Sequence, residues 1–256
     1  TRASTSPRCN PRGQAMELAR RLPYGPRMAQ SPPANRGTYA KSSETRSLIL
    51  DAAIVAFAES GLEGASTRAI AAAAGVNQPL LNYHFGSKDA LYLECAQAIL
   101  ERFADGMAAA TAPAVAFLAQ GQGDRATAHD LLRQLMDALV ETLVMGEEAA
   151  LWAGFVAREM NAPGDAFALL YERLWQPGTE LTAQLIRAAR GSDPDSEEAR
   201  LDALLLIANM IAFTSGRRVS QAIMGWNEIG AEQVAAVRRS IARQVDALVA
   251  DTSREN

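Results

Sequence analysis

The sequence predicts an all-α protein, and three observations lead to this fold class. Apolar residues recur at helical spacing, and no segment shows the apolar and polar alternation of a half-buried strand. Glycine and proline residues end the helical segments at intervals along the chain. The stretch 66–89 reads as two short helices joined at a glycine. We therefore expect about nine or ten helices, arranged as a three-helix N-terminal domain with a helix-turn-helix and a C-terminal helical bundle.

The amino-acid composition limits the classes of protein to which the chain can belong. The 256 residues are 48% hydrophobic and 21% charged, which is ordinary for a globular protein. Cys9 and Cys95 show no metal-ligand spacing, so we expect a reducing cytoplasm, no disulfide framework and no metal or cofactor. The longest apolar run, 201–213, contains Asp202 and Asn209 and is too short to span a bilayer, so no membrane contact is expected. No signal peptide is predicted.

Residues 1–41 are expected to form a disordered, basic extension. Eight Lys or Arg residues stand against the single acid Glu17, a net charge of +7. Six prolines interrupt the segment: Pro7, Pro11, Pro23, Pro26, Pro32 and Pro33. Two interpretations remain open. The segment is either an upstream extension without a role, since Met16 and Met28 are plausible starts, or a basic arm that lies along DNA phosphates.

The expected N-terminal domain, 42–92, begins with a helix that runs from a cap at Ser43 to about Ser60. Gly61 should end this helix. An apolar stripe with a spacing of four residues should be core, without chemical function: Ile49, Ala53 and Phe57.

The helix-turn-helix follows from caps and breakers. Thr67 can cap a short helix that ends at Ala74, and Gly75 can take the left-handed conformation that leaves it. Asn77 should cap a second helix, which accepts Pro79 because proline is tolerated in a first turn. Gly86 should end that helix, and the next should begin at a Ser87 cap and run to about Met107.

The second of these helices has distinct faces. Leu81 and Phe85 are four residues apart and should point inward. The outward residues are Gln78, Leu80, Asn82, Tyr83 and His84. All but Leu80 carry amide, phenol or imidazole groups, which can hydrogen-bond base edges or phosphates. Spacing alone leaves two interpretations open, a DNA-reading helix and an ordinary helical hairpin whose polar face is hydrated.

Three pieces carry a family resemblance: ILDAAIVAFAESG, STRAIAAAAGV and NQPLLNYHFGSKDAL. In this order, the segment from about Ser43 to Leu91 resembles the DNA-binding domain of the TetR family of transcription regulators. The resemblance implies recognition-helix contacts by Gln78, Pro79, Leu80, Asn82, Tyr83 and His84, and backbone contacts by Ser66, Thr67, Arg68 and Lys88. Asn82 stands where an aromatic residue is common in the family, so the operator sequence stays open.

The remainder, 93–251, is expected to be an effector-binding and dimerisation domain. Further helices are predicted at 127–145, 147–160, 165–175, 177–190, 195–224 and 231–250. Within this part, LWAGFVAREM and LLYERLWQP resemble the C-terminal domain of the CecR (YbiH) subgroup of the same family.

A candidate ligand site is the set of aromatic and polar residues in these middle helices: His129, Trp152, Phe155, Arg158, Tyr171, Trp175 and Phe213, with Met160 beside them. Taken alone, each aromatic residue fits plain core better than a ligand contact. Arg158 and its neighbour Glu159 should point in different directions, one in an ion pair and the other as a surface charge.

The resemblance implies a homodimer that binds double-stranded operator DNA and is released by a small hydrophobic effector. Its dimer interface would use the terminal helices 201–224 and 231–250, where Val234, Val237, Ile241, Val245 and Leu248 have helical spacing; the alternative is a monomeric core. Two other classes of function are less favoured. A helical enzyme is disfavoured because no nucleophile and base pair, phosphate loop or metal cluster is evident, so no catalytic residue is assigned. A protein-interaction module that does not bind DNA is the other alternative.

Overall fold

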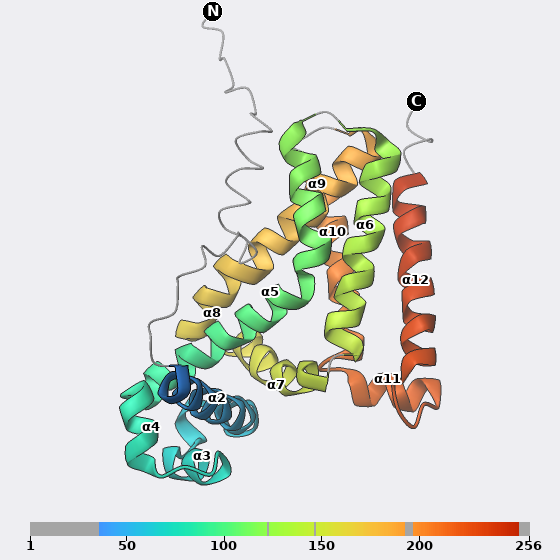
Figure 1. Ribbon diagram of the computed structural model, residues 1–256. Coiled ribbons are helices and arrows are strands. Elements are labelled where there is room, and N and C mark those ends of the chain that lie inside the picture. The colour runs from blue at the N-terminus through green and yellow to red at the C-terminus, as the bar shows by residue number, and fades with distance from the viewer. Residues whose placement is uncertain (1–35, 122, 146, 193–196, 251–256) are drawn as a thin grey trace, which may run out of the picture.

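The computed structural model describes residues 36–121, 123–145, 147–192 and 197–250. The described residues are almost entirely helical and contain no strand, which confirms the predicted all-α class. Figure 1 shows a small three-helix unit, α2 to α4, at one end of a larger bundle. The expected disorder of the N-terminal extension concerns residues that lie almost wholly outside the described part.

The first described helix is α2 (Arg36–Gly64). It begins at Arg36, so the predicted cap at Ser43 is wrong; no glycine or proline stands between Thr38 and Ser43 to interrupt the helix there. The predicted break at Gly61 is confirmed, because this residue has a φ of 72° inside the helix. The predicted stripe Ile49, Ala53 and Phe57 is fully buried.

The next two helices, α3 (Thr67–Ala73) and α4 (Gln78–Phe85), form the predicted corner. Ser66, rather than Thr67, caps α3, because its Oγ accepts a hydrogen bond from the Ala69 N–H at 3.4 Å. Asn77 caps α4 as predicted, with its Oδ1 2.9 Å from the Leu80 nitrogen. Gly75, with a φ of 69°, makes the turn between the two helices.

Helix α5 (Lys88–Gln120) connects the unit to the bundle (Figure 1). Ser87 caps it as predicted, by accepting from the Ala90 N–H at 3.1 Å. The helix continues well beyond the predicted end at Met107 and stops at Gly121, which is left-handed. No glycine follows Met107 until Gly121, and the intervening alanines are strong helix formers.

The bundle consists of α5 and the helices that follow it. These are α6 (Arg125–Val140), the π-helical turn η1 (Glu141–Met145), α7 (Glu147–Asn161), α8 (Asp165–Leu170), the π-helical turn η2 (Tyr171–Trp175), α9 (Gln176–Arg190), α10 (Glu197–Ala208), the 3₁₀ turn η3 (Asn209–Phe213), α11 (Arg217–Met224) and α12 (Ala231–Ala250).

The predicted single helix 195–224 is wrong. The chain breaks between η3 and α11, and the two arms are bent by 76°. At the break, Thr214 is non-helical and its Oγ1 donates to the Met210 carbonyl at 3.1 Å, while the Gly216 N–H donates to Ile211 at 2.8 Å. Among the described helices, none alone has the length and apolar character to cross a membrane, and only this bent pair, taken together, meets that test.

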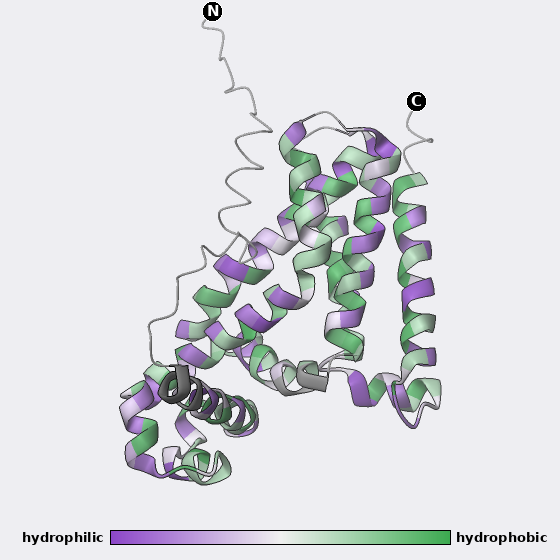
Figure 2. Cartoon of the chain, in the orientation of Figure 1, coloured by the Kyte–Doolittle hydropathy of each residue, from purple (hydrophilic) through white to green (hydrophobic). Residues whose placement is uncertain are grey.

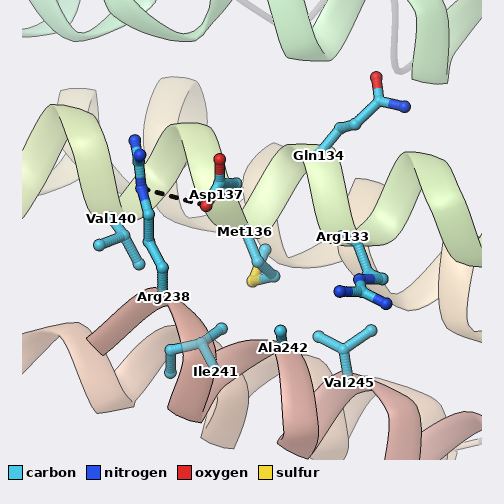
Figure 3. A pocket seen from close by; sticks show the side chains of 9 residues that line it. All are labelled: Arg133, Gln134, Met136, Asp137, Val140, Arg238, Ile241, Ala242 and Val245. Carbon is cyan, nitrogen blue, oxygen red and sulfur yellow. Dashed lines mark ion pairs between the residues drawn. The ribbon is translucent and has the colours of Figure 1, made fainter. Parts of the chain in front are cut away.

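The stripe of α12 predicted as dimer interface lies mostly inside the chain's own core. Val234, Val237, Ile241 and Val245 are buried in the single chain, and Figure 3 shows Ile241 and Val245 facing Met136 and Val140 of α6. An ion pair from Arg238 to Asp137, at 3.1 Å, closes this contact on its polar side (Figure 3). Along α12, polar and apolar residues alternate as an amphipathic helix requires (Figure 2).

Candidate nucleic-acid interface and internal cavity

The outward face of α4 is polar and open to solvent. Leu81 and Phe85 anchor the helix with exposed fractions of 1% and 7%, as predicted. Tyr83 on the opposite side is 82% exposed, and its ring packs edge-on against His84 with 5.5 Å between centroids. Gln78, Pro79 and Asn82 are also exposed, whereas Leu80 and His84 are half-buried. The helix therefore offers two amides and a phenol to a partner.

The residues expected to contact the DNA backbone border the same face. The Gln78 amide donates to Thr67 Oγ1 at 3.3 Å, which joins the start of α4 to the start of α3. Ser66 and Arg68 are exposed beside Thr67. Lys88, at the start of α5, donates to the Glu63 carbonyl at 3.4 Å. The starts of α3 and α4 thus lie side by side, and backbone N–H groups at helix N-termini favour phosphate.

Cations are sparse on this unit. Arg46 of α2 forms an ion pair with Glu94 at 2.6 Å and lies over the Phe85 ring at 5.1 Å, so it is a structural cation. Arg68 is exposed and Lys88 is half-buried. Hydroxyls, amides and helix N-termini must therefore supply much of any phosphate contact.

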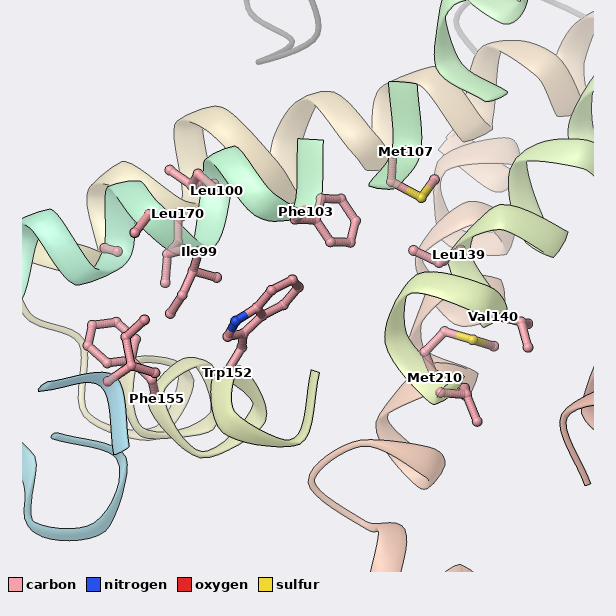
Figure 4. Packing of buried hydrophobic residues seen from close by; sticks show 14 of the residues in the cluster. Ile99, Leu100, Phe103, Met107, Leu139, Val140, Trp152, Phe155, Leu170 and Met210 are labelled. Atoms are coloured by element: carbon pink, nitrogen blue, oxygen red, sulfur yellow. The ribbon is translucent and has the colours of Figure 1, made fainter. Parts of the chain in front are cut away.

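A cavity of about 450 Å³ lies in the bundle. Helices α5 to α10 and the turns η1, η2 and η3 supply its walls. Apolar side chains dominate the lining, among them Phe103, Met107, Leu139, Trp152, Met160, Phe167, Trp175, Leu181, Ile207 and Ile211. The polar side chains that border it are hydroxyls and indole groups. Figure 4 shows Trp152 of α7 lying under Phe103 of α5, with Met107 and Leu139 further along.

Two of the seven predicted ligand residues, Trp152 and Trp175, line this cavity, and Met160 does so as well. The other five lie elsewhere. His129 pairs with Asp246 of α12 at 2.9 Å, Tyr171 is exposed and stacks on Phe167, and Phe213 stacks on Trp226 at 6.3 Å. Phe155 packs on Tyr92 of α5, and Arg158 binds the Glu59 carbonyl of α2.

Sequence reasoning missed the α5 and α6 walls, which include Phe103, Met107 and Leu139. These residues repeat at helical spacing like any core residue, so local sequence does not distinguish a cavity wall from a filled core. Their role depends on how α5 and α6 sit against α7.

Helix α7 has two faces with different neighbours. One face lines the cavity, with residues at positions 152, 153, 156, 157 and 160. The other face holds α2. Arg158 donates to the carbonyls of Ala58, at 3.3 Å, and Glu59, at 2.7 Å, at the end of α2 where Gly61 interrupts it. Gly154 permits the close approach, since a Cβ there would lie 2.9 Å from the Ala58 Cβ.

Buried polar and aromatic contacts strengthen this joint. The Tyr92 hydroxyl of α5 donates to Glu159 at 2.5 Å, and that carboxylate also accepts from the Gly164 N–H at 3.2 Å. Burial, and then the hydrogen bond to Glu159, raise the pKa of Tyr92 well above its usual value, so the phenol remains a donor. Phe57 and Phe155 both pack against Tyr92. The predicted division of Arg158 and Glu159 into an ion pair and a surface charge is wrong, because one binds carbonyls and the other a buried phenol.

An apolar surface remains exposed on α10, η3 and α11. Val219 and Ile223 of α11 are 63% and 78% exposed, which is high for side chains of this kind. The other members of this terminal apolar surface are Leu201, Leu204, Leu205, Ile211 and Met224. It coincides with the first segment that the sequence assigned to a dimer interface.

Comparison with known proteins agrees with this geometry. Residues 49–95 match the family described as bacterial regulatory proteins of the tetR family, and residues 128–251 match the C-terminal domain of the HTH-type transcriptional dual regulator CecR. The CecR protein of Shigella flexneri is 28% identical over 216 residues, which is 84% of this chain and 96% of that protein.

Solved structures share the fold. A TetR-like transcriptional regulator from Rhodococcus sp. RHA1 is 22% identical, with a TM-score of 0.54, over 79% of this chain and 96% of that one. A TetR transcription regulator from Haloarcula marismortui ATCC 43049 is 18% identical, with a TM-score of 0.53, over 80% and 98% of the two chains.

The helix-turn-helix unit, followed by a bundle that contains a cavity, and the matches to both parts define the class. The N-terminal domain of the chain belongs to the TetR family of bacterial regulatory proteins. The C-terminal domain is of the CecR type.

Proposed function

We propose that the protein is a homodimeric, DNA-binding repressor that leaves its operator when a small apolar molecule occupies the bundle cavity. The outward face of α4 carries this proposal, because Gln78, Asn82 and Tyr83 are held on a short, well-anchored helix and exposed to a partner. In this role, Gln78 and Asn82 read base edges, Tyr83 and His84 meet phosphates, and Pro79 and Leu80 make apolar contacts. Ser66, Thr67, Arg68 and Lys88 fix the backbone.

The proposed division places DNA reading in residues 42–92 and effector binding and dimerisation in residues 93–251. A regulator of this kind works in the cytoplasm, where it meets operator DNA and the effector, and it needs no catalytic residue. A second copy is required because one helix-turn-helix reads too few bases; paired modules read half-sites about 34–36 Å apart. The terminal apolar surface on α10, η3 and α11 favours self-association there.

Helix α7 offers a physical route from the cavity to the DNA. Its inner face borders the cavity at Trp152 and Met160, and its outer face binds α2 through Gly154 and Arg158. A ligand that displaces α7 therefore also displaces the joint with α2. In a dimer, such a displacement changes the separation and tilt of the two α4 helices, so that they no longer match successive major grooves.

The energy requirement is modest. A ligand shifts the equilibrium only by its difference in affinity for the two conformations, and a difference of about 1–3 kcal/mol changes operator affinity about 5- to 150-fold. Burial of a methylene group contributes about 0.8 kcal/mol, so a ligand that buries a few more such groups in the released conformation supplies this difference.

The test uses DNA from the region flanking the protein's own gene, in a mobility-shift assay. The wild type should bind a specific fragment in competitor DNA, and Tyr83→Ala should weaken that binding. Tyr171→Ala is the matched control, because Tyr171 is also exposed but lies on η2 in the bundle. A release screen with hydrophobic antibiotics on the same complex tests the effector.

Equal weakening by both tyrosine variants, or no specific binding by the folded wild type, would contradict the proposal. The second outcome would favour the alternative of a protein-interaction module without DNA binding.

A further inference from the structure

The cavity wall carries no charged side chain. Its 27 lining residues include aliphatic, aromatic, methionine, glycine, serine and threonine residues, and no Asp, Glu, Lys, Arg or His among the described part of the chain. Moving an isolated charge from water into such surroundings is strongly unfavourable without a partner of opposite charge. The wall therefore disfavours both a carboxylate and an ammonium ligand.

Three threonine hydroxyls of the wall already donate to their own helices. Thr111 Oγ1 donates to the Met107 carbonyl at 3.0 Å, Thr182 Oγ1 to Gly178 at 2.9 Å and Thr214 Oγ1 to Met210 at 3.1 Å. Because each hydroxyl has a single proton, these oxygens can offer a ligand only their lone pairs.

Trp152 differs from these hydroxyls. Its side chain is 7% exposed, and its indole Nε1 is buried and has no hydrogen-bond partner among the described residues. A buried donor without a partner costs about 1–3 kcal/mol, so such groups are rare in folded proteins. Indole is a donor only, hence the group that satisfies it must be an acceptor. In Figure 4, Trp152 lies among the apolar side chains of α5 and α7.

We propose that the cavity takes an uncharged, mainly apolar molecule that carries a hydrogen-bond acceptor, such as a ketone, ester or ether oxygen, and that Trp152 Nε1 donates to that acceptor. The cavity volume of about 450 Å³ falls within the range of small-molecule sites, which is about 300–1,000 Å³. This inference rests on the proposed effector role of the cavity and defines the chemistry of its ligand.

The position of Trp152 also connects the ligand with release. Trp152 lies on α7, and two residues further along, Gly154 meets Ala58 of α2. A ligand atom that is hydrogen-bonded to Trp152 therefore acts on α7, the helix that contacts the three-helix unit. An apolar ligand without an acceptor would fill the cavity but lack this anchor.

The test measures dissociation constants of four naphthalene probes by equilibrium dialysis on the full chain: 2-acetonaphthone, 2-ethylnaphthalene, 2-naphthoate and (2-naphthylmethyl)trimethylammonium. The first two are uncharged and differ in the acceptor, and the last two carry opposite charges. We expect the ketone to bind, and both ions to bind at least about 100-fold more weakly.

Trp152→Phe removes the donor and keeps an aromatic ring, while Trp175→Phe is the matched control in the same wall. The ratio of ketone to hydrocarbon affinity should fall about 2- to 12-fold in Trp152→Phe, the value of one hydrogen bond, and stay unchanged in Trp175→Phe. An unchanged ratio in folded Trp152→Phe, or an ion that binds as tightly as the ketone, would overturn the inference.

A second measurement uses the wild-type protein and needs no substitution. The chain has three tryptophans, so ¹⁵N-tryptophan labelling gives three indole N–H resonances. The ketone should shift one of them to lower field, and 2-ethylnaphthalene should not; equal effects of the two probes would count against the donor role. Operator release, measured separately, distinguishes the two proposals: Trp152-dependent ketone binding without any release leaves this inference intact and removes the effector mechanism.

Discussion

The outward face of α4 and the bundle cavity are opposite kinds of surface in one chain. The first exposes amide and phenol groups on a helix of eight residues, held by Leu81 and Phe85. The second is lined by six helices and three helical turns and has an apolar wall, in which Trp152 has a buried indole N–H without a partner among the described residues. The difference fits the two proposed partners: a polar, anionic polymer for α4 and an uncharged small molecule for the cavity. Helix α7 is the element that connects the cavity with the three-helix unit.

The largest expected effect comes from the terminal apolar surface, on which the proposed paired reading of DNA depends. Val219→Asp combined with Ile223→Asp should give a monomer in sedimentation at micromolar concentration. Operator affinity should then fall toward the non-specific level, by about 1,000-fold or more.

Leu48→Asp is the control for that pair, since Leu48 is 50% exposed but lies on α2. A wild type that sediments as a monomer while binding its operator tightly would refute the need for a second copy.

The next largest effect is on operator affinity and comes from residues of the α4 face alone. Gln78→Ala and Asn82→Ala should each weaken operator binding about 5- to 150-fold, because a specific base contact contributes about 1–3 kcal/mol. Fluorescence anisotropy with labelled operator measures the loss, and ligand binding in the cavity should be unaffected. Gln120→Ala, at the far end of α5, should change neither; similar losses in all three variants would mean that α4 holds no special role.

A smaller effect tests the close approach of α7 and α2. Gly154→Ala places a methyl group 2.9 Å from the Ala58 Cβ, so the two helices must separate. Overpacking of this kind costs about 1–3 kcal/mol of unfolding free energy, measurable by urea denaturation. Stability equal to the wild type would show that the joint is not tightly packed.

The smallest effect concerns the turn before α4. Gly75 and Gly178 both have open space where a Cβ would stand, but only Gly75 has a positive φ, of 69°. Gly75→Ala should therefore destabilise the fold by about 1–2 kcal/mol, whereas Gly178→Ala, within α9, should stabilise it by about 0.4–1 kcal/mol. Urea denaturation measures both changes, and equal values would contradict the conformational explanation.

The two regions also differ in how far the sequence predicts them. The α4 corner follows from neighbouring residues, so Asn77 as a cap, Gly75 as the turn and Leu81 as the anchor were all correctly predicted. The cavity depends on how distant segments lie against one another, such as those that carry Phe103 and Trp152, and its α5 and α6 walls could not be predicted from local pattern. Arg158 is charged, as many ligand-binding residues are. It nevertheless donates a hydrogen bond to the Ala58 carbonyl, so its role is structural.

The wrongly predicted helix ends also depend on contacts between segments that are distant in the sequence. The break after η3 depends on Gly216, whose N–H binds the Ile211 carbonyl, and a glycine inside an apolar run can also continue a helix. Tertiary packing decides between these outcomes, as it decides which stripe of α12 is buried.

The most direct test of the account is the effect of a releasing compound on operator affinity in Arg158→Ala. The variant loses the bonds from α7 to the Ala58 and Glu59 carbonyls but leaves the cavity wall intact. We predict that the compound binds this variant as tightly as the wild type while its effect on operator affinity falls several-fold, and that the control Arg173→Ala keeps the full effect. Undiminished release in Arg158→Ala would contradict the claim that α7 couples the cavity to the DNA-reading helix.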